Sequence, residues 1–153
     1  MSTPEERLAE LGLTVPEVVP PVAAYQPTAR TGTLLYTAGQ LPMRDGALVA
    51  AGKLGGGVSE EQGYEAARQC ALNALAAIKA EIGELSLVRR VVKVVVFVAS
   101  EPDFTAQPKV ANGASELLGE VFGEAGKHAR SAVGVSVLPL DAAVEVELIV
   151  EVA

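Results

Sequence analysis

The stretch "LVRRVVKVVVFVAS", residues 87–100, consists largely of β-branched residues. Such residues favour strands, and a nearly continuous apolar run is typical of a strand that is buried on both faces. We therefore predict a central strand here, buried on both faces towards its C-terminal end. Arg90 and Lys93 are expected to extend their charged ends towards solvent or into a groove.

Two long helices are predicted, one before and one after this strand in the chain. The pair Ser59–Gln62 has the spacing of a capping box, and the helix that follows is expected to end at about Ile82. The other helix is expected from about Pro108 to Gly123 or Gly126. Apolar residues in both segments recur at three- and four-residue spacing, so each helix has one face to bury.

Further strands are predicted over residues 34–41, 129–138 and 142–153. The last of these alternates strictly, with its glutamates on one side and its valines on the other. The order of the elements predicts an α+β sandwich with both long helices on one face of a sheet. Because the other face is largely apolar, we expect a homo-oligomer to cover it. The length of 153 residues fits one domain, with residues 1–20 as a helical and extended N-terminal extension.

The composition argues against several classes of function. The net charge of −7 repels phosphate backbones, and aromatic residues make up only 4% of the chain, which leaves few surfaces for base stacking. We therefore expect no nucleic-acid partner. The acidic N-terminal stretch lacks the pattern of a signal peptide, and the longest apolar run is too short to cross a bilayer. These features predict a soluble, cytoplasmic protein without a membrane partner.

The cysteine and histidine contents limit the chemistry further. One cysteine and one histidine cannot form an intrachain disulfide or a Cys/His zinc site, so no metal is expected. Cys70 lies on or next to the apolar side of its helix and is interpreted as a small core residue rather than a nucleophile. The glycine-rich loop over residues 52–59 lacks the ending of a phosphate-binding loop and is interpreted as a hinge.

Arg130 stands at the start of the predicted strand "ARSAVGVSVL". A guanidinium offers a carboxylate two parallel hydrogen bonds, so at an oligomer boundary it would bind a small anionic ligand. The turn "PLD" predicts that the last two strands form a hairpin, which would place Arg130 near the face that carries Glu145. An ion pair between these two residues that only holds the hairpin is the alternative. His128 is interpreted as a surface or loop histidine rather than a catalyst.

The chain resembles a known family at several of these places. The segments "ARSAV", "LPLDAAVEVELIVEV", "YTAGQLP" and "VVKVVVFVAS" look like those of the Rid family of reactive-intermediate (imine) deaminases, also called the YjgF or L-PSP endoribonuclease family. The likeness extends from about Tyr25 to the C-terminus, and the "GKLGGG" loop is similar to a longer bacterial branch. The resemblance implies a chorismate-mutase-like α+β fold with a mixed sheet. It also implies homotrimers with clefts between neighbouring subunits.

The resemblance implies roles for particular residues as well. Arg130 would bind the carboxylate of a 2-imino or 2-enamino acid, and Glu145 would position or activate water, so these two are the expected catalytic residues. The residues expected to bind substrate are Tyr25, Gly39, Gln40, Asn112 and Ala132. The products would be a 2-keto acid and ammonia, and no cofactor is implied.

The sequence also departs from the active deaminases of that family. Ala132 stands where a cysteine is common, Gly134 stands where a glutamate is often found, and "AAY" replaces the usual "GPY". These differences change the shape and polarity of the cleft. The alternative function is therefore a regulatory module that binds a small carboxylic acid without turnover. RNA cleavage, which the older family name suggests, is disfavoured by the charge of −7 and by the lack of a second histidine.

Overall fold

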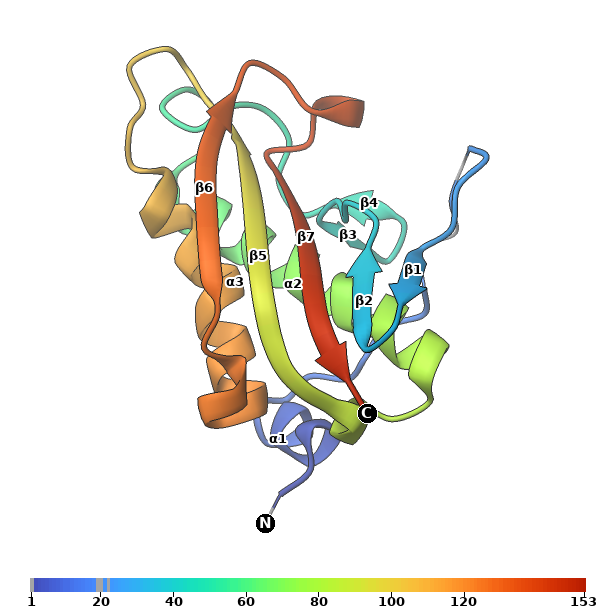
Figure 1. Ribbon diagram of the computed structural model, residues 1–153. Coiled ribbons are helices and arrows are strands. Elements are labelled where there is room, and N and C mark those ends of the chain that lie inside the picture. The colour runs from blue at the N-terminus through green and yellow to red at the C-terminus, as the bar shows by residue number, and fades with distance from the viewer. Residues whose placement is uncertain (1, 19–20, 22) are drawn as a thin grey trace.

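The computed structural model describes residues 2–18, 21 and 23–153 and shows a mixed sheet with helices packed on one of its faces (Figure 1). The strand order of the five-stranded sheet is β1-β2-β7-β5-β6. These strands are β1 (Thr28–Thr31), β2 (Leu34–Thr37), β5 (Val88–Ala99), β6 (Ala129–Val135) and β7 (Val144–Val152). A separate small hairpin consists of β3 (Met43–Arg44) and β4 (Ala47–Leu48). The α+β class and the mixed sheet expected from the sequence are confirmed.

Both long helices lie behind the sheet in the view of Figure 1. They are α2 (Glu60–Ile82) and α3 (Gln107–Phe122), and the shorter helices are α1 (Pro4–Glu10), η1 (Leu85–Leu87), η2 (Gly123–Gly126) and η3 (Pro139–Asp141). The predicted capping box at the start of α2 is present. The Ser59 hydroxyl oxygen accepts a hydrogen bond from the Gln62 amide at 3.1 Å, and the Gln62 side-chain oxygen accepts one from the Ser59 amide at 2.9 Å.

The central position of β5 follows from its pairing. It runs parallel to β6 and antiparallel to β7, with Val94 opposite Arg130 on one side and Leu148 on the other. Its alternate valines, including Val96, are fully buried beneath the helices. On the opposite face Val95 and Phe97 are only half-buried within one chain. The prediction of burial on both faces is therefore met along the helix side, and on both faces only at the C-terminal end, where Val98 and Ala99 are buried.

The predicted hairpin between the last two strands is wrong. The chain turns at η3 as expected, but β5 lies between β6 and β7, so the two strands do not pair with each other. Arg130 is opposite Val94 of β5, whereas Glu145 is opposite Phe97. The two residues are thus separated by one whole strand, which a local turn signal cannot reveal.

The N-terminal extension packs against the helical layer. Leu8 of α1 is buried in the core, and Arg7 donates a hydrogen bond to the Val121 carbonyl oxygen of α3 at 3.1 Å. Glu5 forms an ion pair with Lys79 of α2 at 3.2 Å. The extension predicted over residues 1–20 includes residues 1, 19 and 20, which lie outside the described residues.

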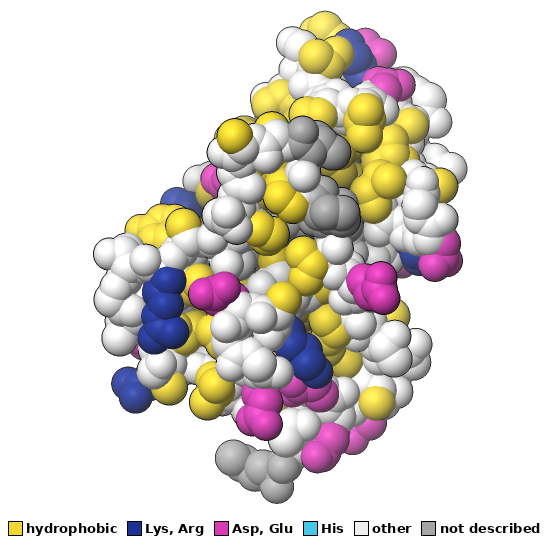
Figure 2. All heavy atoms as spheres, turned by 90° about the vertical axis from the view of Figure 1, so that its right-hand side faces the viewer, with side chains coloured by type: hydrophobic (Ala, Val, Ile, Leu, Met, Phe, Trp, Pro, Cys, Tyr) yellow, Lys and Arg dark blue, Asp and Glu magenta, His cyan; other side chains and the backbone are white. Residues whose placement is uncertain are grey.

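The face of the sheet opposite the helices carries many apolar side chains. Val133 and Phe97 are cross-strand neighbours on this face, as are Ile149 and Tyr36. Val133 is 44% exposed and Tyr36 41% exposed. Apolar side chains also reach the surface when the molecule is viewed from the side of β1 (Figure 2). One chain alone therefore leaves a broad, partly apolar surface on this face. In the described part of the chain, each helix is too short or too polar to cross a membrane.

A close approach between α2 and α3 provides a test of the helical packing. A Cβ atom added at Gly113 of α3 would overlap the Tyr64 carbonyl oxygen of α2. We expect Gly113→Ala to lower the free energy of unfolding by about 1–3 kcal/mol, because the helices must move apart. Gly119→Ala is the matched control, since Gly119 lies on the exposed side of the same helix with open space around it. The control should raise stability by about 0.5–1 kcal/mol through helix propensity. Urea unfolding measures both, and equal effects would contradict this account of the packing.

Candidate functional site

Arg130 is held against helix α3 by two neutral side chains. Its Nη1 atom donates hydrogen bonds to Asn112 Oδ1 at 2.9 Å and to Ser115 Oγ at 3.1 Å. Asn112 and Ser115 are three residues apart on α3, so they lie on one face of the helix. Within the described ranges, no aspartate or glutamate forms an ion pair with Arg130. The alternative of an Arg130–Glu145 ion pair that holds a hairpin therefore does not apply to this chain.

The hydrogen bonds continue from Ser115 to the histidine. The Ser115 hydroxyl lies 2.8 Å from His128 Nε2, and His128 Nδ1 lies 2.6 Å from the Gly126 carbonyl oxygen. His128 thus occupies the loop between η2 and β6, as its interpretation as a loop histidine requires, but its ring is not free in that loop. The sequence interpretation missed Ser115 altogether. Its three-residue spacing from Asn112 is the only local signal that could have revealed it.

Glu145 lies on the opposite face of the sheet from Arg130. Along β7 the valines face the helices and are buried, whereas Glu145 and the other glutamates face the open side. Burial, followed by the charge of nearby Glu147, raises the pKa of the Glu145 carboxyl above its ordinary value. Proton transfer near neutral pH is favoured by such a shift.

Gly39 and Gln40 bring the chain against this carboxylate. Gln40 pairs with Val146 through two backbone hydrogen bonds of 2.8 and 3.0 Å, which extends the contact between β2 and β7. A Cβ atom added at Gly39 would overlap the carboxylate of Glu145. Glycine at position 39 therefore lets the Glu145 carboxylate lie directly against the backbone. The side chain of Gln40 is itself buried and points its amide towards the Ala38 carbonyl oxygen at 3.5 Å.

The remaining predicted residues lie at the two edges of the sheet. Ala132 follows Arg130 on the helix-facing side of β6 and packs against the core. Tyr25 precedes β1 at the far edge and is 48% exposed. Four strand spacings separate these edges, or about 19 Å at the usual spacing. One chain therefore brings Arg130, Asn112 and Ala132 together, and separately Gly39, Gln40 and Glu145. It does not bring the two groups or Tyr25 together.

Gly134 has a structural consequence that the sequence did not reveal. A Cβ atom added there would lie 2.7 Å from Gln107 Nε2, so the side chain of Gln107 occupies the space beside the glycine. Gln107 Nε2 donates to the Phe104 carbonyl oxygen at 2.8 Å and to Ser100 Oγ at 3.3 Å. These residues border a polar cavity of about 310 Å³ at the C-terminal ends of β5 and β6. Its lining consists of Lys53, Ser100, Glu101, Pro102, Phe104, Gln107, Gly134, Val135 and Ser136.

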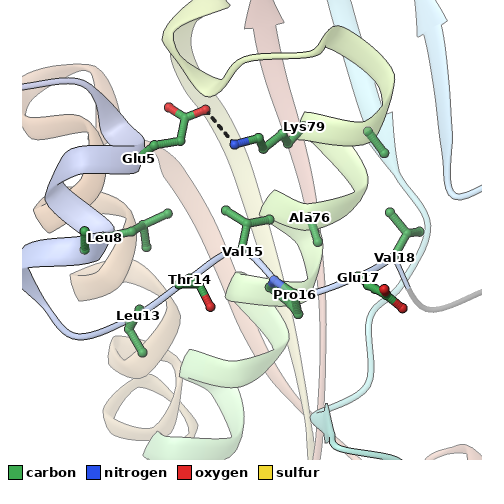
Figure 3. A pocket seen from close by; sticks show the side chains of 12 residues that line it. Glu5, Leu8, Leu13, Thr14, Val15, Pro16, Glu17, Val18, Ala76 and Lys79 are labelled. Carbon is green, nitrogen blue, oxygen red and sulfur yellow. Dashed lines mark ion pairs between the residues drawn. The ribbon is translucent and has the colours of Figure 1, made fainter.

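A larger cavity of about 470 Å³ lies where the N-terminal segment crosses α2 (Figure 3). Leu8, Val15 and Ala76 line it, and the Glu5–Lys79 ion pair crosses one side. None of the residues predicted for the site is among its described lining residues. This cavity is therefore distinct from the surroundings of Arg130.

The Cys70 thiol and the carboxylates of the described residues were considered as a nucleophile and as metal ligands. Cys70 is fully buried, and this burial raises the pKa of its thiol well above the ordinary value. Its interpretation as a core residue is confirmed. Among the described residues, histidine, cysteine and carboxylate side chains do not form a group of three that could hold a metal ion.

The raised pKa of Glu145 leads to a test by pH. A carboxyl whose pKa is raised in the folded protein adds stability below its ordinary value, here 4.5, and loses that contribution as the pH rises. The charged form therefore destabilises the fold at neutral pH. Glu145→Gln should raise the melting temperature at pH 7. The difference from the unaltered protein should narrow as the pH falls through the raised pKa of Glu145, and it should be smallest below 4.5. Glu151→Gln, on the same strand and face, is the control. If Glu145→Gln raised the melting temperature by the same amount at every pH, the assignment of the effect to the raised pKa of Glu145 would be wrong.

Comparison with known proteins identifies the family of this chain. Residues 5–152 match the family model described as "YjgF/chorismate_mutase-like, putative endoribonuclease". Protein TCP17 of Trypanosoma cruzi is 46% identical over 145 residues, which are 94% of this chain and 91% of that protein.

Solved structures extend the likeness to three dimensions. A crystal structure of a protein of unknown function from Agrobacterium tumefaciens has a TM-score of 0.91 at 46% identity, covering 98% of this chain and 92% of the other. A crystal structure from Shewanella oneidensis, described as that of a "putative endoribonuclease", has a TM-score of 0.96 at 38% identity, covering 99% of this chain and 100% of the other. The YjgF gene product of E. coli shares the fold, with a TM-score of 0.66 at 22% identity over 99% and 98% of the two chains. The family likeness seen in the sequence is therefore confirmed, and the chain belongs to the YjgF/chorismate mutase-like family.

Proposed function

We propose that the protein deaminates reactive 2-imino or 2-enamino acids by hydrolysis and that Arg130 binds the substrate carboxylate. The observation that carries this proposal is the hydrogen bonding of the guanidinium. In the described part of the chain only its Nη1 atom is engaged, and its partners Asn112 and Ser115 are neutral. The Nε and Nη2 edge remains available, and that edge matches a carboxylate with two parallel hydrogen bonds. The charge of Arg130 is likewise left for an anionic ligand to balance.

The reaction itself requires little from the protein. Water adds to the electrophilic imine carbon, the carbon–nitrogen bond then breaks, and a 2-keto acid and ammonia leave. An enamino acid first becomes the imine by taking up a proton at carbon and losing one from nitrogen. Arg130 fixes the position of the carbon relative to the water, and Glu145 exchanges protons with that water. Positioning together with acid–base assistance of this kind contributes roughly two to four powers of ten in rate. The raised pKa of Glu145 supports its assignment to this step.

The separation of the two groups supports a site between subunits. Arg130 lies at the edge of the sheet on the helix side, whereas Glu145 lies on the open face. Tyr25 lies at the opposite edge. We infer that copies of the chain pack their open faces together as a homotrimer, so that residues from neighbouring copies complete each cleft. The exposed apolar side chains of that face, such as Val133 and Tyr36, favour burial in such an assembly.

A binding module without turnover is the second candidate. Ala132 and Gly134 remove a thiol and a carboxylate that active relatives often carry, and this specific difference favours binding alone. Saturable binding of a small carboxylic acid without release of ammonia would identify that function. RNA cleavage has less support, because the single histidine of the chain is already hydrogen-bonded on both ring nitrogens.

The decisive experiment compares Arg130→Ala with a matched arginine variant. Freshly generated 2-aminoacrylate and related imino acids are supplied, and ammonia release is followed over time. Arg130→Ala should reduce the rate to that of the uncatalysed reaction, because the carboxylate is no longer held. Arg68→Ala is the control, since Arg68 of α2 pairs with Glu120 of α3 at 3.5 Å and is not among the residues of the candidate site. Light scattering should show the same assembly for both variants. Unchanged ammonia release from Arg130→Ala would reject the proposal.

A further inference from the structure

We propose that His128 is a positioning residue that orients Arg130 through the hydroxyl of Ser115. This inference rests on the proposed function, because it concerns the same guanidinium and its carboxylate ligand. The chain of contacts runs from Arg130 Nη1 to Ser115 Oγ at 3.1 Å, then to His128 Nε2 at 2.8 Å. It ends where His128 Nδ1 meets the Gly126 carbonyl oxygen at 2.6 Å. Each of these distances is within normal hydrogen-bonding range.

The backbone selects the tautomer of the neutral imidazole. A carbonyl oxygen can only accept a hydrogen bond, so the Nδ1 atom that faces the Gly126 carbonyl must carry a proton. In the neutral ring the Nε2 atom is then an acceptor. Gly126 is itself fixed, because a Cβ atom added there would overlap the Leu118 carbonyl oxygen of α3. The hydrogen bond from Nδ1 to Gly126 thus fixes the imidazole ring relative to α3, and with it the position of the acceptor atom Nε2.

The acceptor nitrogen in turn sets the direction of the Ser115 hydroxyl. A serine hydroxyl has one hydrogen and two lone pairs. With its hydrogen directed to His128 Nε2, the oxygen presents its lone pairs to Arg130 Nη1. Without that acceptor, a serine within a helix can turn its hydroxyl to a backbone carbonyl in the preceding turn. The oxygen would then no longer be fixed in the direction that Arg130 needs.

This arrangement prepares the guanidinium for a ligand without neutralising it. The Asn112 oxygen and the Ser115 oxygen hold the two hydrogens of Nη1, so the plane of the guanidinium is set before binding. Ligand affinity increases when such a group does not have to be ordered on binding. The relay belongs to the β6 edge of the sheet, and the view of the opposite edge in Figure 2 accordingly shows no histidine.

The test uses pyruvate as the carboxylate probe and measures its dissociation constant by calorimetry on the full chain. His128→Phe keeps the volume of a ring but removes both nitrogens, and should weaken binding by about three- to tenfold, the value of one oriented hydrogen bond. His128→Gln restores an acceptor near the Nε2 position and should return the affinity to within about twofold of the unaltered protein. Lys127→Ala is the control, since Lys127 is exposed and pairs with Glu124.

A double variant separates the relay from a general effect on folding. Because His128 acts through Ser115, the variant that combines Ser115→Ala with His128→Phe should bind pyruvate as weakly as Ser115→Ala alone. Long-range ¹H–¹⁵N spectra of the unliganded protein should show the Nδ1–H tautomer, and the Nε2 signal should move in Ser115→Ala. Multiplicative losses in the double variant, no loss in His128→Phe, no recovery in His128→Gln or an Nε2–H tautomer would each overturn the inference. Absence of pyruvate binding by the unaltered protein would instead overturn the proposed function on which it rests.

Discussion

The placement of β5 between a parallel and an antiparallel neighbour is the constraint on which the rest of the structure depends. A parallel neighbour can be reached only through a crossover, so α3 must lie across the sheet before β6 begins. The last strand must then pass to the other side of β5. This path leaves Arg130 at the outer edge beside α3 and puts Glu145 in the middle of the open face. The separation of the two groups is therefore a result of topology and not of side-chain conformation.

The two groups share an electrostatic property despite this separation. Asn112 and Ser115 orient the guanidinium but carry no charge to offset it. Glu145 is half-buried and, among the described residues, forms no ion pair with a cation. A guanidinium held in place by neutral partners retains its attraction for an opposite charge on a ligand.

Much of the fold could be predicted from local patterns. The capping box at Ser59, the periodicity of both helices and the alternation of the last strand are signals within a few residues, and each was confirmed. The pairing of the last two strands was not predictable in this way. The turn at η3 shows that the chain reverses, but it does not show that β5 lies between the strands it joins. The residues within β5 and β6 do not by themselves indicate that the two strands pair in parallel.

The candidate site shows the same limit. The family resemblance drew attention to Arg130 and Asn112, and the structure places them in contact at 2.9 Å. Ser115 was not identified from the sequence, and His128 was interpreted only as a surface or loop histidine, because their contact depends on the crossover that brings α3 beside β6. The position of Gln107 was not predicted for a related reason, since its side chain fits there only because Gly134 has no side chain.

The side chain of Gln107 fills the space that a side chain at position 134 would occupy, and this affects which residues can change at the polar cavity. A group that projects from an edge strand is tied to the pleat, and so its position along the strand is fixed in steps of two residues. A group delivered by the first turn of a helix can be altered, lengthened or withdrawn while the strand keeps its backbone pairing. With glycine at position 134, the polar group at this end of the cavity is the amide of Gln107, which the first turn of α3 supplies in place of the strand.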